Sequence, residues 1–103
     1  MQSISTQNGY RRPLGYQQIT SATLAAATKL TLPSVTNGQQ NTYAIIQNNG
    51  TTNVRWRDDG TAPTATVGMV LPAGGELNYS GDLALIQFIY VATGAILDVM
   101  TYA

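Results

Sequence analysis

The chain has 103 residues, with five basic and five acidic side chains and neither histidine nor cysteine. This length is typical of a single domain. Without histidine and cysteine, the imidazole base, the thiolate nucleophile and the usual ligands of transition metals are absent, so we expect no enzyme, no metal site and no cofactor. The zero net charge provides no basic field that would concentrate nucleic acid.

The surface is expected to be polar and neutral. Charged residues make up 10% of the chain, whereas serine, threonine, asparagine and glutamine together supply 34 of its 103 positions. Because charged residues are few, electrostatic repulsion between copies of the protein is weak. This composition therefore favours a protein that packs permanently against itself or a larger assembly. The chain lacks both a long apolar run and the basic-then-apolar order of a secretory signal, so neither membrane insertion nor export is expected.

Residues 1–15 contain little apolar material and no sustained period, which predicts an extended N-terminal arm in front of a domain over residues 16–103. Such an arm is either disordered or docked on a neighbouring protein. Four of its side chains are candidates for docking: Tyr10, Arg11, Arg12 and Leu14.

From residue 16 onward, short β segments alternate with turn residues at a spacing of about ten residues. The expected segments are 16–20, 29–32, 43–47, 53–57, 69–71, 76–79, 85–91 and 95–102. An alanine-rich stretch over 22–27 is too short for a stable isolated helix. The pattern predicts an all-β fold, a small jelly-roll-like β-sandwich of seven to eight short antiparallel strands, and leaves the strand order open.

Period-two alternation assigns side chains to the two faces of each strand. Val54 and Trp56 share one face of their strand, and Arg55 and Arg57 share the other. The residues expected in the core are Ile45, Val54, Trp56, Leu77, Ile86, Phe88, Leu97 and Val99.

The adjacent acids Asp58 and Asp59 suggest either a calcium loop or a carboxylate dyad. The continuation over residues 61–64 lacks both the alternating oxygen ligands and the distal glutamate of a calcium loop. A turn is favoured instead, in which the carboxylates pair with Arg55 or Arg57 or cap backbone amides.

Other chemical interpretations are weaker. Trp56 between two arginines could stack on sugars or single-stranded nucleic acid, but the alternation directs it away from them and favours a core position. No feature selects a pair of the five acids for glycoside hydrolysis. Asp98, beside apolar neighbours, is interpreted as an edge-strand charge or a salt-bridge partner.

Four segments resemble a group of small virion-associated proteins of tailed bacteriophages. They are LGYQQIT at 14–20, YAIIQ at 43–47, VRWRDDGTAPTATVGM at 54–69 and GAILDV at 94–99. The resemblance covers most of the chain from residue 14 onward. It brings no catalytic residues.

The resemblance implies a structural protein on the exterior of the virion, made in the host cytoplasm. The first expectation is a capsid decoration or cement protein, a homotrimer whose arm lies on the major capsid protein and which binds neither nucleic acid nor membrane. The alternatives are a receptor- or glycan-binding module of a head or tail fibre and a minor tail or connector component. The residues expected in the ligand loop of such a module are Asp58, Asp59, Thr61 and Thr64, with exposed tyrosines as a further possibility.

Overall fold

The computed structural model describes residues 12–34 and 41–103, which form eight short strands and one helical turn. In chain order the elements are β1 (Pro13–Ile19), α1 (Ser21–Leu24), β2 (Thr28–Lys29), β3 (Tyr43–Asn48), β4 (Val54–Arg57), β5 (Met69–Leu71), β6 (Glu76–Tyr79), β7 (Gln87–Tyr90) and β8 (Leu97–Tyr102). The predicted all-β sandwich is confirmed.

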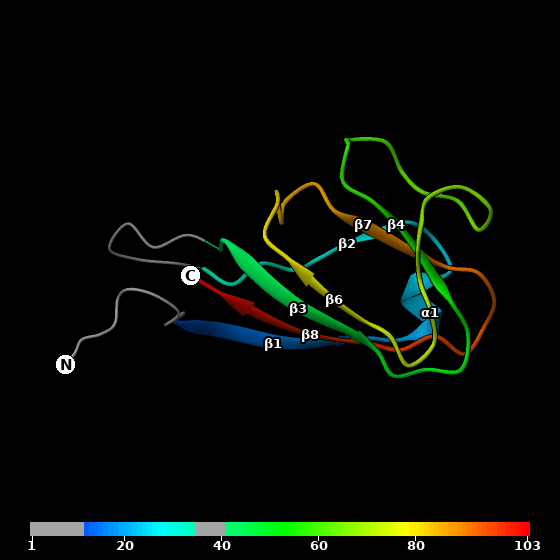
Figure 1. Ribbon diagram of the computed structural model, residues 1–103, viewed down its shortest axis with the longest axis horizontal. Coiled ribbons are helices and arrows are strands. Elements are labelled where there is room, and N and C mark those ends of the chain that lie inside the picture. Colours follow the sequence, from blue (N-terminus) through cyan, green and yellow to red (C-terminus); the bar gives the residue numbers. More distant parts are fainter. Residues whose placement is uncertain (1–11, 35–40) are drawn as a thin grey trace.

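The strands form two antiparallel four-stranded sheets with the orders β1-β8-β3-β6 and β2-β7-β4-β5 (Figure 1). The strands pair from the two ends of the chain inward: β1 with β8, β2 with β7, β3 with β6, and β4 with β5. This is the pattern of one long hairpin that has been rolled up. The pairs β3–β8 and β4–β7 then complete the sheets. This pairing is the topology of a jelly roll.

The core lies between the two sheets. In β8, Leu97, Val99 and Thr101 are buried, whereas the residues between them are partly exposed. Fully burying such an aliphatic side chain contributes about 1.5–3 kcal/mol. Of the residues expected in the core, Val54, Ile86, Phe88, Leu97 and Val99 are fully buried, and Trp56 and Leu77 are partly buried against the core.

Ile45 does not lie in the core, contrary to the sequence prediction. The buried positions of β3 are Ala44, Ile46 and Asn48, so Ile45 points to the outer face of its sheet. Two adjacent isoleucines make the alternation ambiguous. The alternation is fixed by the polar Asn48, which would be expected on the outer face of the strand but is buried because its side chain has hydrogen-bond partners inside the protein.

Two other local features differ from the sequence expectation. β1 begins at Pro13 rather than residue 16, so Pro13, Leu14 and Gly15 belong to the sheet and not to the arm. Their backbone groups pair with β8, which depends little on side-chain type. A single helical turn, α1, follows Thr20, because buried Leu24 anchors it in the core. No helix in the described part of the chain is long and apolar enough to cross a membrane.

Candidate functional site

One sheet presents an open face whose composition suits recognition. The outer sheet face consists of the side chains of the β1-β8-β3-β6 sheet that point away from the core. They are Tyr16, Gln18, Tyr43, Ile45, Gln47, Glu76, Asn78, Asp98, Met100 and Tyr102. Tyrosine and methionine are enriched in binding surfaces, whereas lysine is depleted there. No lysine or arginine stands at these positions.

Strand register arranges this face in three rows. The aromatic row contains Tyr43 and Tyr102, with Pro13 beside Tyr102. The middle row contains Tyr16, Met100, Ile45 and Asn78, and the polar row contains Gln18, Asp98, Gln47 and Glu76. Cross-strand neighbours have Cβ atoms about 4.5–5.5 Å apart, so each row is a continuous strip of contacting side chains.

Asp98 is the centre of a hydrogen-bonded cluster on this face. Its Oδ1 accepts from the Tyr16 hydroxyl at 2.5 Å and from Gln18 Nε2 at 3.0 Å, and its Oδ2 accepts from Asn49 Nδ2 at 2.6 Å. The bond from Tyr16 is the main reason why the pKa of Asp98 lies below its usual value, and it raises the pKa of Tyr16. These partners are neutral and β8 is an inner strand, so the expectation of an edge charge or salt bridge is wrong.

A small cavity opens where the middle and polar rows meet. It has a volume of about 210 Å³ and is lined by Tyr16, Ile45, Gln47, Asp98, Val99 and Met100. One wall is therefore aromatic and aliphatic, and the other carries a carboxylate and an amide.

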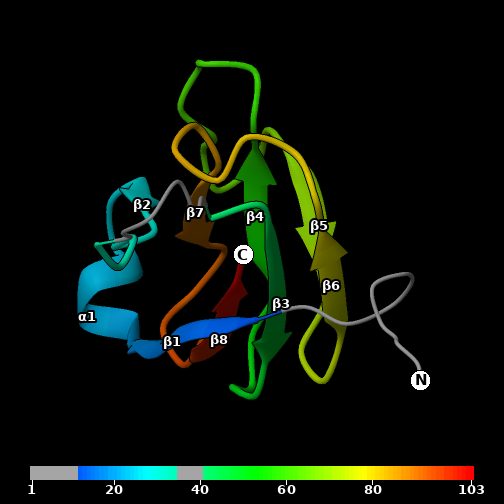
Figure 2. The ribbon, with the colours of Figure 1, turned by 90° about the vertical axis from the view of Figure 1, so that its left-hand side faces the viewer.

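The aromatic row lies where the chain passes from its N-terminal segment into β1. The rings of Tyr43 and Tyr102 are 5.8 Å apart and inclined at 50°, and the Tyr43 hydroxyl donates to Asn78 Oδ1 at 2.9 Å. The Arg12 carbonyl accepts from the amide of Ala103 at 2.8 Å, which holds the C-terminus at the same end (Figure 2).

The residues expected to contact a capsid are only partly described. Arg12 is exposed just before β1, and Leu14 is half-buried within that strand. Tyr10 and Arg11 lie outside the described residues. The structure therefore places Arg12 and Leu14 next to the aromatic row.

The two acidic residues of the predicted ligand loop already have hydrogen-bond partners within the protein. Asp58 Oδ2 accepts from the Tyr79 hydroxyl at 2.6 Å, and Asp59 pairs with Arg57 at 2.5 Å. Asp59 Oδ1 also accepts from the Thr61 amide at 3.3 Å, as the turn interpretation predicted. The Arg57 guanidinium is the main reason why the pKa of Asp59 is lowered.

The four predicted loop residues do not converge on one cavity. Asp58 and Asp59 line a hollow of about 330 Å³ together with Arg57, Val67, Gly68 and Met69, whereas Thr61 and Thr64 do not line it. The backbone of Thr64 instead forms an isolated bridge with Val67. Within the described residues, no three carboxylates lie close enough together to hold a metal ion.

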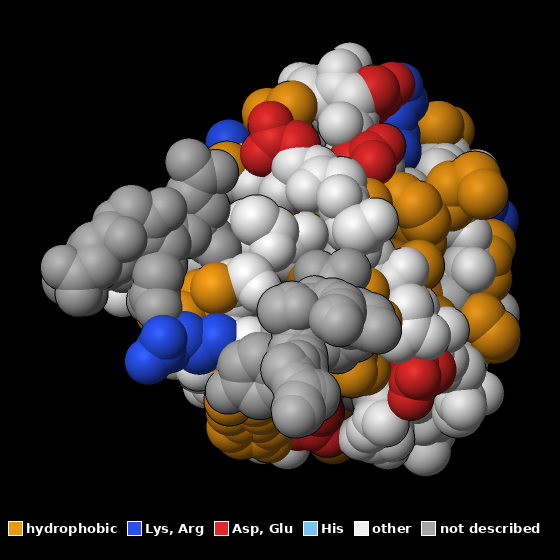
Figure 3. Space-filling view, turned by 60° about the vertical axis from the view of Figure 1, so that its left-hand side comes forward, with side chains coloured by type: hydrophobic (Ala, Val, Ile, Leu, Met, Phe, Trp, Pro, Cys, Tyr) orange, Lys and Arg blue, Asp and Glu red, His pale blue; other side chains and the backbone are white. Residues whose placement is uncertain are grey.

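A second exposed surface surrounds β5, an edge strand of its sheet. We define the β5 edge patch as Val67, Met69 and Val70, which are all exposed, Met69 to 61%. In Figure 3 the charged side chains form a few small groups among the other described atoms. Arg57, Asp58 and Asp59 border the β5 edge patch, since they line one hollow together with Val67 and Met69.

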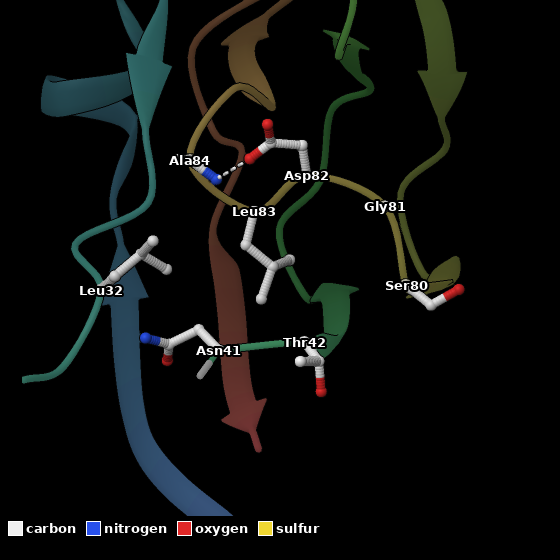
Figure 4. Close-up of a pocket in the computed structure, with 8 residues that line it drawn as sticks. All are labelled: Leu32, Asn41, Thr42, Ser80, Gly81, Asp82, Leu83 and Ala84. Atoms are coloured by element: carbon white, nitrogen blue, oxygen red, sulfur yellow. Dashed lines mark hydrogen bonds between the residues drawn. The ribbon is translucent and has the colours of Figure 1, made fainter. Parts of the chain in front are cut away.

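A hollow of about 470 Å³ lies beside the loop after β6 (Figure 4). It is lined by Leu32, Asn41, Thr42, Ser80, Gly81, Asp82, Leu83 and Ala84. Asp82 Oδ1 accepts a hydrogen bond from the backbone amide of Ala84 at 2.9 Å, and this bond stabilises the loop itself. Asn41 Nδ2 donates to the Pro33 carbonyl at 3.2 Å. Its polar lining comes from Asn41, Thr42, Ser80 and Asp82, and the buried Oδ1 of Asn41 has no hydrogen-bond partner among the described residues. No aromatic side chain lines this hollow, so the outer sheet face, with its exposed Tyr16 beside polar groups, is the better candidate for recognition.

Comparisons with protein-family models, with curated proteins and with solved structures find no match for this chain. We therefore infer its function from the residues and their geometry.

Proposed function

We propose that this chain is a structural protein on the exterior of a tailed-bacteriophage particle, where it binds the lattice of the major capsid protein as a decoration protein. Three features support this. Segments over 14–20 and 54–69 resemble virion-associated phage proteins, the composition is neutral and polar, and jelly rolls are a common architecture of viral capsid domains. Because one fold hosts many functions, the fold alone does not decide between them.

The observation that carries the proposal is the position of the aromatic row. Tyr43, Tyr102 and Pro13 form an apolar end of the outer sheet face, and the N-terminal segment enters β1 beside them through exposed Arg12. This end of the sandwich and the arm can therefore contact one capsid surface together. Two linked contacts bind much more tightly than either contact alone.

Homotrimer formation is part of the proposal, with the β5 edge patch as its contact. An edge strand leaves backbone groups unpaired on one side, and Val67, Met69 and Val70 place exposed apolar side chains there. In a closed trimer the β5 edge patch of one copy would pack against a different surface of the next copy, which would cover both features. Sedimentation at micromolar concentration is expected to give a trimer, and a monomer that also fails to assemble on capsids would contradict this part.

Removing the arm tests capsid binding directly. Because β1 begins at Pro13, deletion of residues 1–11 leaves every described strand intact. We expect an unchanged melting temperature and loss of binding to capsid shells that lack this protein, measured by co-sedimentation. The exposed loop variant Thr64→Ala serves as the control and is expected to bind normally. Unchanged occupancy by the deletion variant would contradict the arm's role.

The alternative of a fibre module that binds a ligand through the 58–64 loop receives less support. The carboxylates of Asp58 and Asp59 already accept hydrogen bonds from Tyr79 and Arg57. A minor tail or connector component is distinguished from a decoration protein by its number of copies in the particle.

A further inference from the structure

We propose that the middle and polar rows of the outer sheet face bind one ring of a neutral saccharide. The site consists of the cavity bounded by Tyr16, Ile45 and Met100 on one side and by Gln47 and Asp98 on the other. This function is additional to capsid decoration and does not depend on it, because the aromatic row and the arm lie at a different end of the face.

Tyr16 provides a platform for stacking. Its side chain is 61% exposed although it belongs to a paired strand, and its hydroxyl is held by Asp98 at 2.5 Å. The ring is thereby fixed before any ligand arrives, which lowers the entropy cost of binding. Met100 stands opposite Tyr16 in the register and Ile45 opposite Met100. Together they form an apolar strip that matches the C–H face of a sugar ring.

The polar row supplies partners for the hydroxyl groups of the sugar. A carboxylate has about four acceptor positions, and the three bonds at Asp98 leave one of them open. Gln47 donates to Glu76 Oε1 at 2.9 Å, so its amide is also held in place. Sugar hydroxyls both donate and accept, as do the amides of Gln18, Gln47 and Asn49.

Charge and size define the ligand class. Asp98 and Glu76 are the only ionisable carboxylates on the outer sheet face, which has no basic side chain to offset them, so anionic sugars and phosphate are repelled. A cavity of about 210 Å³ is smaller than the roughly 300–1,000 Å³ of sites for drug-sized ligands and suits a single ring. Affinity for one ring is therefore expected near the millimolar range, where display of many copies would multiply it.

The test is an NMR titration of the full-length protein with neutral oligosaccharides of glucose, galactose, mannose and N-acetylglucosamine, and with sialyllactose as the anionic counterpart. At least one neutral oligosaccharide is expected to bind with a Kd of about 1 mM and to shift the resonances of Tyr16 and Met100. Tyr16→Ala and Asp98→Asn are each expected to weaken binding about tenfold or more. Tyr16→Phe keeps the ring but frees it from Asp98, so we expect a smaller loss.

Matched controls separate a binding defect from misfolding. Thr64→Ala and Asp59→Asn alter the predicted ligand loop and are expected to leave the affinity within about twofold, and thermal unfolding verifies that each variant folds. The proposal is overturned if no neutral sugar binds at about 10 mM, if Tyr16→Ala binds normally, if sialyllactose binds this face equally well, or if the shifts map to residues 58–64. None of these outcomes depends on capsid binding.

Discussion

Asn48 is a buried polar side chain in β3, at a position where an aliphatic residue would be expected. Its Nδ2 donates to the carbonyl oxygens of Thr52 at 2.9 Å and Leu71 at 3.1 Å, and its Oδ1 accepts from the Gly50 amide at 3.2 Å. Because Leu71 belongs to β5, one amide ties together the two sheets and the turn after β3.

Replacement of Asn48 by alanine is therefore expected to be costly. Asn48→Ala leaves buried backbone groups without partners, and we expect the free energy of unfolding to fall by about 2–4 kcal/mol in urea denaturation. Asn78→Ala, an amide on the exposed outer face, is the matched control and is expected to cost less than about 1 kcal/mol. Equal losses for the two variants would show that Asn48 does not have this structural role.

Tyr79 makes stability sensitive to alkaline pH. Burial, followed by the hydrogen bond to Asp58, raises its pKa from 10.0 to about 12. The folded state therefore holds this proton more tightly than the unfolded chain does. Below pH 10 the contribution of Tyr79 to the free energy of unfolding is fully present and does not change with pH. As the pH rises from 10 toward 12, that free energy falls by at most about 2–3 kcal/mol.

Urea unfolding followed by Trp56 fluorescence between pH 8 and about 12 measures this loss. Tyr79→Phe keeps the edge-to-face packing on Trp56, at 6.0 Å between ring centroids, and removes the ionisable group. The variant is expected to lose less stability over that pH range than the unmodified protein. Identical slopes for the two proteins would assign the alkaline loss to other groups.

Strand faces were predictable wherever alternation is unambiguous. Residues 97–102 alternate strictly, and their buried and outer faces are as expected, with Asp98 beside Met100 and Tyr102 on the outer side. Adjacent Ile45 and Ile46 carry no such signal, and there the sequence interpretation chose the wrong face.

The candidate site was not predictable in the same way. Tyr16 and Asp98 are 82 positions apart, and they meet only because β1 pairs with β8. Hydrophobic pattern indicates that a strand exists but not which strand is its neighbour. The alternation placed Asp98 on an outer face, but no local signal linked it to Gln18 or Asn49.

The turn after β3 shows how one element is held against another. The backbone amide of Asn49 donates to the Ile96 carbonyl at 2.8 Å, and the backbone amide of Thr51 donates to the Gly94 carbonyl at 3.0 Å. A Cβ at Gly50 would collide with the backbone of Gly94 and of the two residues that follow it. The lack of a side chain at Gly50 permits this close approach.

Gly50→Ala is therefore expected to destabilise the protein by about 2–4 kcal/mol, since the obstructing atoms are backbone rather than flexible side chain. Gly60→Ala is the control. Gly60 has a φ of 87° but open space around its Cβ position, so only backbone strain of about 1–2 kcal/mol is expected. Thermal unfolding of both variants decides whether close backbone approach or strain costs more.

At the scale of the whole molecule, three surfaces of the jelly roll are assigned three roles. We propose that the aromatic row and arm bind the capsid, that the β5 edge patch joins copies, and that the remaining outer sheet face binds sugar. The aromatic row and the sugar site lie at different positions along β1, β3 and β8, and the β5 edge patch belongs to the other sheet, so one subunit can use all three surfaces at once. Many identical subunits on a lattice would then present many weak sugar sites, which bind a polysaccharide with high avidity.

The central claim, decoration of the capsid lattice, is tested most directly by the copy number per purified phage particle. Quantitative mass spectrometry gives this number relative to the major capsid protein. Our proposal predicts hundreds of copies, in a fixed ratio to the lattice. Three to a few dozen copies would contradict it and would place the protein at a vertex, tail or fibre.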